Sequence, residues 1–211
     1  MLRTPTPNQA FQSSSFQNSS LDHVTINLIC QHTTLHAQAK QSLQLEGFTI
    51  SENGLVTLIV DSFHGHALLT LEFQRLHNVV VMTSNPCSEY QADLLEFGAK
   101  AVVSPIGNNT ALFQAILKTA KGEHFQTLLP KSSKLTPTER HILRLVANGL
   151  ENKEIARVLG SCDATVRNQV TSILEKISST HGDLKLENRT HLALFYWGMW
   201  HTLAGRVTIV I

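Results

Sequence analysis

The chain has 211 residues, of which 42% are hydrophobic and 16% charged, a composition typical of a folded globular protein with one large or two small domains. The 17 Lys and Arg residues nearly balance the 16 Asp and Glu residues, so the overall charge indicates neither a nucleic-acid nor a membrane partner. The three cysteines are far apart and lack zinc-ligand spacing, which argues against a disulfide scaffold or structural zinc site and fits a reducing cytoplasm. No stretch reaches the roughly 18 apolar residues of a membrane-spanning helix.

The two ends of the chain differ from the rest in composition. Residues 1–20 are rich in Ser, Gln, Asn and Pro and have no apolar centre, so we expect a disordered tail and no secretory signal. Residues 204–211, AGRVTIVI, are apolar and β-branched. This second tail either pairs with a sheet edge or lies in a dimer interface, and the sequence does not decide between the two.

Between residues 21 and 128, short apolar runs alternate with stretches of helical periodicity, which is typical of a doubly wound α/β sheet. The predicted strands are residues 24–30, 55–60, 78–82 and 100–106, and the predicted helices are residues 36–47, 66–77, 88–98 and 109–122. Only three residues separate FTIS (48–51) from the next strand, which we take as too few for a parallel crossover. FTIS therefore either pairs antiparallel or is not a full strand, and one crossover helix is reduced or lost.

A polar linker at residues 129–134 leads to residues 135–203, where the pattern is wholly helical. Thr136-Pro137-Thr138-Glu139 is a capping box, which predicts the start of a helix. Further helices are expected from Asn152 to Gly160, from about Asp163, and over 189–200. The third of the four helices places its apolar residues on one stripe, namely Val166, Val170, Ile173 and Ile177.

The opposite face of this third helix carries side chains suited to reading DNA. They are Thr165, Arg167, Asn168, Gln169 and Thr171. Arg can bond to guanine with two donors, Asn and Gln match adenine, and Thr can contact a base edge, a thymine methyl or a phosphate. Two short helices joined by a glycine-containing turn before such a face indicate a helix-turn-helix. The face alone is equally typical of an ordinary polar helix surface.

The string LTPTERHILRLVANGLENKEIARVLGSCDATVRNQVTSILEKI at 135–177, with NRTHLALFYW at 188–197, resembles the four-helix DNA-binding domain of the LuxR/FixJ/NarL response-regulator family. The resemblance implies that the third helix enters the major groove and that the last helix mediates dimerisation. By position, it implies that Lys153 and Lys176 contact phosphates and that the five residues above face the groove. The charge of residues 134–206 agrees modestly with DNA binding, because this region has ten basic residues and seven acidic ones.

The string also departs from the family pattern. Ser161 and Cys162 stand where an apolar residue and a capping Ser are usual, Gln169 replaces a common His, and about eight residues are inserted at 178–185. Family target sequences and half-site spacing therefore do not transfer. The aromatic residues of the last helix are expected in the core or a dimer face, and they are Phe195, Tyr196, Trp197 and Trp200.

The domain before the linker is similar to the flavodoxin-like receiver of this family. By position, Asp61 stands for the phosphoacceptor and Thr83 for the hydroxyl that follows the fourth strand. Three other parts of the relay are replaced: the acidic pair by Cys30 and Gln31, the Lys by Ser104, and the switch aromatic by Ala101. Because Mg²⁺ prefers carboxylate oxygens, the resemblance implies a degenerate receiver without Mg²⁺-dependent phosphorylation. It implies control by dimerisation, an unknown small ligand or a protein partner.

We therefore expect a cytoplasmic transcription regulator that binds double-stranded DNA as a homodimer, with no catalytic residue, metal or cofactor. One rival is a conventional regulator phosphorylated at Asp61. Another is an interaction module that no longer binds DNA and sequesters a related regulator. Cys162 is either a simple substitution at the helix start or a redox switch on DNA binding.

Overall fold

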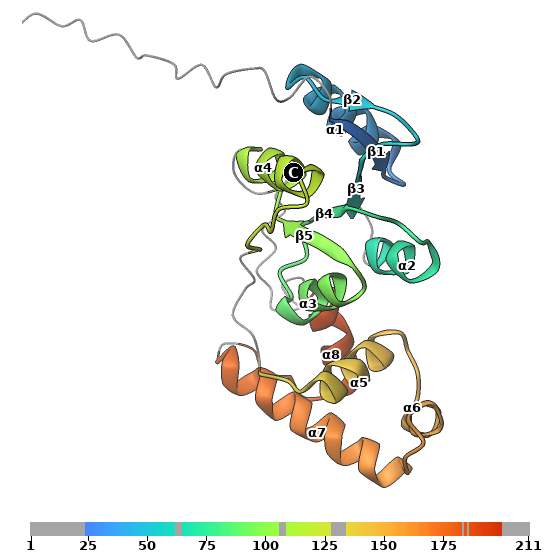
Figure 1. The fold of residues 1–211 in the computed structure, drawn as a ribbon. Coiled ribbons are helices and arrows are strands. Elements are labelled where there is room, and N and C mark those ends of the chain that lie inside the picture. The colour runs from blue at the N-terminus through green and yellow to red at the C-terminus, as the bar shows by residue number, and fades with distance from the viewer. Residues whose placement is uncertain are drawn as a thin grey trace, which may run out of the picture.

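The computed structural model describes residues 24–61, 65–105, 109–127, 134–182, 184 and 186–199. They form an α/β domain followed by a helical domain, as expected (Figure 1). The predicted tails at 1–20 and 204–211 and almost all of the linker lie outside the described residues. Within the described segments, no helix is both long and apolar enough to cross a bilayer.

The described part of the N-terminal domain contains a parallel five-stranded sheet with the order β2-β1-β3-β4-β5. The strands are β1 (Thr25–Ile29), β2 (Thr49–Ile50), β3 (Val56–Asp61), β4 (Val79–Thr83) and β5 (Ala99–Val103), and the helices are α1 (Thr33–Leu45), α2 (His66–Phe73), α3 (Ser88–Glu96) and α4 (Thr110–Ala120). Helices α1 and α4 cover one face, and α2 and α3 cover the other. Because both faces are covered, the central strands are nearly continuous apolar runs. The predicted flavodoxin-like fold is confirmed.

The connection from β2 to β3 takes only residues 51–55 in place of a crossover helix. Contrary to our expectation for so short a connection, β2 pairs parallel with β1. It can do so because β2 has only two residues and both β2 and β3 meet β1 at the level of Ile26, so the chain need not run back along the sheet. The connection passes so close to β1 that a Cβ on Gly54 would lie 2.2 Å from the backbone N of Asn27. The alternative that 48–51 is not a full strand is confirmed.

The described C-terminal domain consists of α5 (Pro137–Ala147), α6 (Asn152–Leu159), α7 (Asp163–Thr180) and α8 (Arg189–Tyr196). The capping box at the start of α5 is confirmed: the N–H of Glu139 donates to the Thr136 hydroxyl, and the N–H of Thr136 donates to the Glu139 carboxylate. The predicted apolar stripe of α7 is buried, including Val166, Val170, Ile173 and Ile177. Helix α7 continues to Thr180, so the first residues of the 178–185 insertion lengthen it.

Candidate nucleic-acid interface and the Asp61 carboxylate

The turn between α6 and α7 sets these helices as a helix-turn-helix. Helix α6 ends at Leu159, and its C-cap residue Gly160 has a left-handed φ of 61°. The N–H of Ser161 then donates to the carbonyl of Ala156 at 2.8 Å. Ile155 on α6 and Val166 on α7 are fully buried in the shared apolar core, which holds the two helices together. The local sequence thus presents α7 as the second helix of the motif.

The predicted groove-facing residues lie on the side of α7 that points away from this core. Four of the five are exposed and one, Gln169, is half-buried; the exposed ones are Thr165, Arg167, Asn168 and Thr171. Figure 1 shows α7 on the side of the helical domain remote from the sheet, so the described N-terminal domain leaves this face open. The structure brings the predicted set together on one surface.

Arg167 is held in place by its own helix. Its guanidinium pairs with Asp163 one turn earlier at 2.6 Å, and the Thr171 hydroxyl donates to its backbone carbonyl at 3.2 Å. The Arg167 side chain is 68% exposed, and an exposed pair of this kind contributes little free energy. The guanidinium can therefore exchange Asp163 for another acceptor at low energetic cost.

The two lysines predicted at phosphates have different surroundings. Lys153 is exposed on α6. The ammonium of Lys176 instead donates to both carboxylate oxygens of Glu139 on α5, at 2.8 and 2.7 Å. Burial alone would raise the pKa of Glu139, but hydrogen bonds from Lys176, Thr136 and Ser172 lower it to about 2. Lys176 thus has a partner that the sequence analysis missed, and its phosphate contact stays a prediction.

Cys162 begins α7 as an exposed residue at its N-cap. Its Sγ lies 3.1 Å from the hydroxyl oxygen of Thr165. This contact, together with backbone N–H groups of the first turn, lowers the pKa of the Cys162 thiol below its ordinary value.

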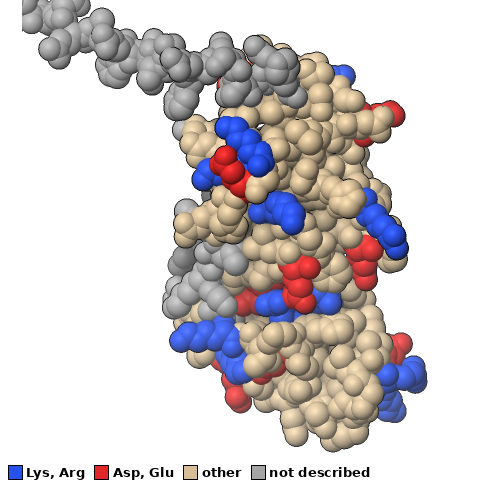
Figure 2. All heavy atoms as spheres, viewed as in Figure 1, with Lys and Arg blue, Asp and Glu red and all other residues tan. Residues whose placement is uncertain are grey.

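Figure 2 shows acidic and basic side chains interspersed on one face of the molecule, in line with the small local excess of positive charge.

Asp61 ends β3, and its half-buried carboxylate accepts three hydrogen bonds. The hydroxyls of Thr83 and Tyr90 both donate to Oδ2 at 2.8 Å, and the N–H of Ala67 donates to Oδ1 at 3.2 Å. Thr83 thus lies beside Asp61, as the resemblance implied. Tyr90, on the first turn of α3, was missed by the sequence analysis.

The residues at the other relay positions do not fit a Mg²⁺ site. Cys30 and Gln31, which follow β1, supply no carboxylate oxygen, and the Cys30 thiol donates to the carbonyl of His32. Ser104 is exposed after β5, and Ala101 is fully buried in the sheet. The described residues contain no cluster of three or more His, Cys, Asp or Glu that could hold a metal ion.

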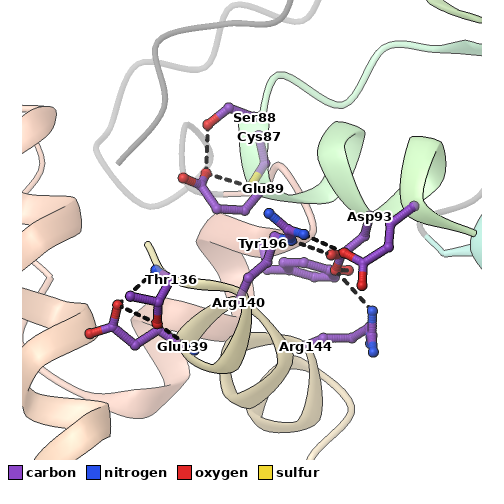
Figure 3. Close-up of polar contacts among 10 residues, drawn as sticks. Cys87, Ser88, Glu89, Asp93, Thr136, Glu139, Arg140, Arg144 and Tyr196 are labelled. Atoms are coloured by element: carbon purple, nitrogen blue, oxygen red, sulfur yellow. Dashed lines mark hydrogen bonds and ion pairs between the residues drawn. The ribbon is translucent and has the colours of Figure 1, made fainter. Parts of the chain in front are cut away.

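Asp93 on α3 joins the two domains (Figure 3). This carboxylate has no exposed surface, and it accepts a 2.6 Å hydrogen bond from the Tyr196 hydroxyl of α8. It also pairs with Arg140 at 2.7 Å and with Arg144 at 3.4 Å, both on α5, and Arg140 pairs with Glu96 as well. Burial raises the pKa of Asp93, and its three donors oppose the rise. Tyr196, expected in a core or dimer face, lies against the other domain.

Comparison with known proteins agrees with this architecture. Residues 133–195 match the family model described as bacterial regulatory proteins, luxR family. The transcriptional regulatory protein DesR of Bacillus subtilis is 30% identical over 105 residues, which are 47% of this chain and 53% of DesR. The uncharacterized transcriptional regulatory protein YhcZ of the same organism is 30% identical over 135 residues, which are 56% of this chain and 59% of YhcZ. The chain thus spans little more than half the length of these relatives.

Two further similarities concern a 63-residue stretch of the sequence and the fold of the chain. The nitrate/nitrite response regulator NarL of Escherichia coli is 41% identical over 63 residues, 30% of this chain and 26% of NarL. RcsB of Salmonella enterica serovar Typhimurium, solved bound to the promoter rprA with the phosphomimetic BeF3-, has a TM-score of 0.51 at 21% identity, covering 83% of this chain and 98% of that structure. These are regulators rather than enzymes. Residues 133–195, which contain the helix-turn-helix, are thus similar to the luxR family of bacterial regulatory proteins, and they follow a domain with the parallel sheet of a receiver.

Proposed function

We propose that this protein is a sequence-specific transcription regulator that binds double-stranded DNA as a homodimer through the outer face of α7. The observation that carries the proposal is the open set of Thr165, Arg167, Asn168 and Thr171 on a helix whose opposite stripe is buried. These side chains suit base edges and phosphates and have no packing task in the domain. The luxR-family match of residues 133–195 and the names of DesR and NarL support the same function.

Dimerisation has a structural condition in this fold. The resemblance assigns it to the last helix, yet α8 is packed against α5 and sends Tyr196 into the receiver-type domain. Its buried residues are Leu192, Phe195 and Tyr196. A dimer formed through the Tyr196 face of α8 therefore requires the two domains to separate first.

The test is selection of the full chain against a randomised duplex library at physiological salt, followed by titration of the enriched duplex. Arg167→Ala should weaken binding to that duplex by about 1–3 kcal/mol while changing binding to random DNA little. Lys121→Ala, which removes an exposed positive charge of the receiver-type domain, is the matched control and should bind normally. Equal losses on both duplexes would remove Arg167 from base reading, and absence of enrichment would favour the interaction-module rival.

The proposal includes control that does not use Mg²⁺-dependent phosphorylation of Asp61. It is supported by the replaced relay positions and by the three neutral donors that already occupy the Asp61 carboxylate. Incubation with a small phosphodonor and Mg²⁺, analysed by intact mass, should leave the protein unmodified. A stoichiometric gain of one phosphoryl group that Asp61→Ala abolishes would instead establish the conventional response regulator.

A further inference from the structure

Tyr90 contacts both the Asp61 carboxylate and the helical domain. Its side chain has no exposed surface, and its hydroxyl donates to Oδ2 of Asp61 at 2.8 Å. Its ring meets the ring of Tyr196 edge-on at 5.5 Å and lies 5.9 Å from the ring of Trp197. One rigid side chain therefore spans the distance between the end of β3 and the end of α8.

The hydroxyl end of Tyr90 depends on the Asp61 carboxylate. A buried phenol needs a hydrogen-bond acceptor, and the acceptor that the structure gives Tyr90 is the charged Oδ2. Burial raises the pKa of Tyr90, and the negative charge of Asp61 raises it further, so the hydroxyl stays protonated and remains a donor. The bond fixes how far the ring reaches toward α8.

The ring end of Tyr90 lies where the two domains approach closely. A Cβ on Gly65, four residues after Asp61, would lie 2.7 Å from the Trp197 ring. A Cβ on Gly198, just after α8, would lie 2.7 Å from the Asn85 side-chain oxygen, and the Asn85 amide donates to the carbonyl of Tyr196 at 3.0 Å. Both glycines also have a positive φ, 84° for Gly65 and 69° for Gly198. Any larger residue at either position would therefore be strained in its backbone as well as crowded by the other domain. The two domains are therefore in close contact at Gly65 and Gly198, next to the rings that Tyr90 touches.

From these contacts we infer that Asp61 acts as a positioning residue for the domain interface, and that Tyr90 transmits the state of its carboxylate to α8. While Oδ2 accepts the Tyr90 hydroxyl, the ring supports Tyr196 and Trp197 and the helical domain stays docked. Whatever neutralises or occupies Oδ2 frees Tyr90 and loosens α8. The coupling rests on the contacts of Tyr90, and it holds whether or not the protein binds DNA.

The experiment is amide hydrogen exchange of the full chain, read at α8. Tyr90→Phe keeps the ring and removes the hydroxyl, and Asp61→Asn keeps the shape of the acceptor and removes its charge. Each should speed exchange of the α8 amides on the order of tenfold, the effect of losing one hydrogen bond to a charged group. Because the inferred effect on α8 runs through the Tyr90–Asp61 bond, the double variant should exchange no faster than Asp61→Asn alone. Exchange in α1, which covers the opposite face of the sheet, should not change.

A second readout uses the two tryptophans of the chain, Trp197 and Trp200. In a Trp200→Phe background, emission from Trp197 should shift to longer wavelength in both single variants. Ile116→Val, buried on the opposite face of the sheet, is the control for general destabilisation and should shift neither readout. Additive effects of Tyr90→Phe and Asp61→Asn, or unchanged α8 exchange in folded variants, would overturn the inference. If Tyr90→Phe does not fold, Asp61→Asn against Ile116→Val decides the question alone.

Discussion

The ammonium of Lys176 on α7 lies between both carboxylate oxygens of Glu139 on α5, a residue that is only 7% exposed. The same carboxylate accepts the N–H and hydroxyl of Thr136 and the hydroxyl of Ser172. Glu139 therefore both caps α5 and forms an ion pair that links α5 to the proposed recognition helix, α7. One acidic residue of the capping box thus adds a polar link between α5 and α7 to the buried apolar stripe of α7.

Glu139→Gln should destabilise the helical domain by roughly 1–2 kcal/mol at neutral pH, because it loses the charge-assisted bond to Lys176 and weakens the cap. The pKa of Glu139 is lowered from 4.5 to about 2, so its ionised form stabilises the fold above pH 4.5 and this contribution is lost as the pH falls toward 2. The difference in unfolding free energy between wild type and Glu139→Gln should shrink over that interval. Denaturant titrations at pH 7 and pH 3 measure it.

Glu175→Gln, which removes an exposed acidic residue of the same helix as Lys176, is the matched control for Glu139→Gln. It should leave the unfolding free energy within about 0.5 kcal/mol of wild type. A difference between wild type and Glu139→Gln that stays constant from pH 7 to pH 3 would contradict the account, because it would mean that the Glu139 charge contributes nothing.

Much of the fold follows from local sequence pattern. Apolar runs became strands within one residue of the predicted bounds, except that β5 ends at Val103, three residues before the predicted end. The agreement arises because strands covered on both faces must be apolar throughout. The capping box and the apolar stripe of α7 are also local, and both are found as predicted. The exposed face of α7 is the complement of that stripe, so the candidate DNA-reading residues could be named as well.

The parts that sequence could not predict are contacts between distant segments. Nothing in the sequence near Tyr90 indicates that its hydroxyl reaches Asp61, 29 residues earlier, or that Asp93 accepts a bond from Tyr196, 103 residues later. The parallel pairing of β2 depends on a close approach of the backbone at Gly54 to β1. The number of residues between FTIS and the next strand, from which we predicted the pairing, carries no information about this approach. Such features depend on the tertiary fold rather than on periodicity.

Cys162 should react with iodoacetamide at pH 7.5 well before Cys87. The thiol of Cys162 is exposed with a lowered pKa, whereas burial raises the pKa of the Cys87 thiol and the neighbouring Glu89 charge raises it further. Thr165→Val removes the hydroxyl nearest Cys162 and should slow its alkylation several-fold. Peptide mapping by mass spectrometry at timed intervals measures both rates. Equal rates in wild type and Thr165→Val would show that the hydroxyl does not stabilise the thiolate.

Arg140→Met should weaken docking of the two domains by about 2–4 kcal/mol, because it leaves the fully buried Asp93 carboxylate with fewer donors. Adding Asp93→Asn to Arg140→Met should recover part of that loss, since the uncompensated buried charge is then gone. The α8 amide exchange of the single and double variants gives the docking free energies. A double variant that docks more weakly than Arg140→Met would show that Asp93 serves the interface through its other donors, Arg144 and Tyr196.

Gly54→Ala should destabilise the receiver-type domain by about 3 kcal/mol, the upper end expected for overpacking. The new Cβ would lie 2.2 Å from the backbone N of Asn27 and 2.4 Å from the backbone C of Ile26, and neither atom can move without breaking the pairing of β1. Gly182→Ala is the matched control, because a Cβ there meets nothing within 4 Å and Gly182 has no positive φ. Denaturant unfolding of both variants measures the difference, and equal stabilities would mean that the 51–55 connection bends away from β1 at little cost.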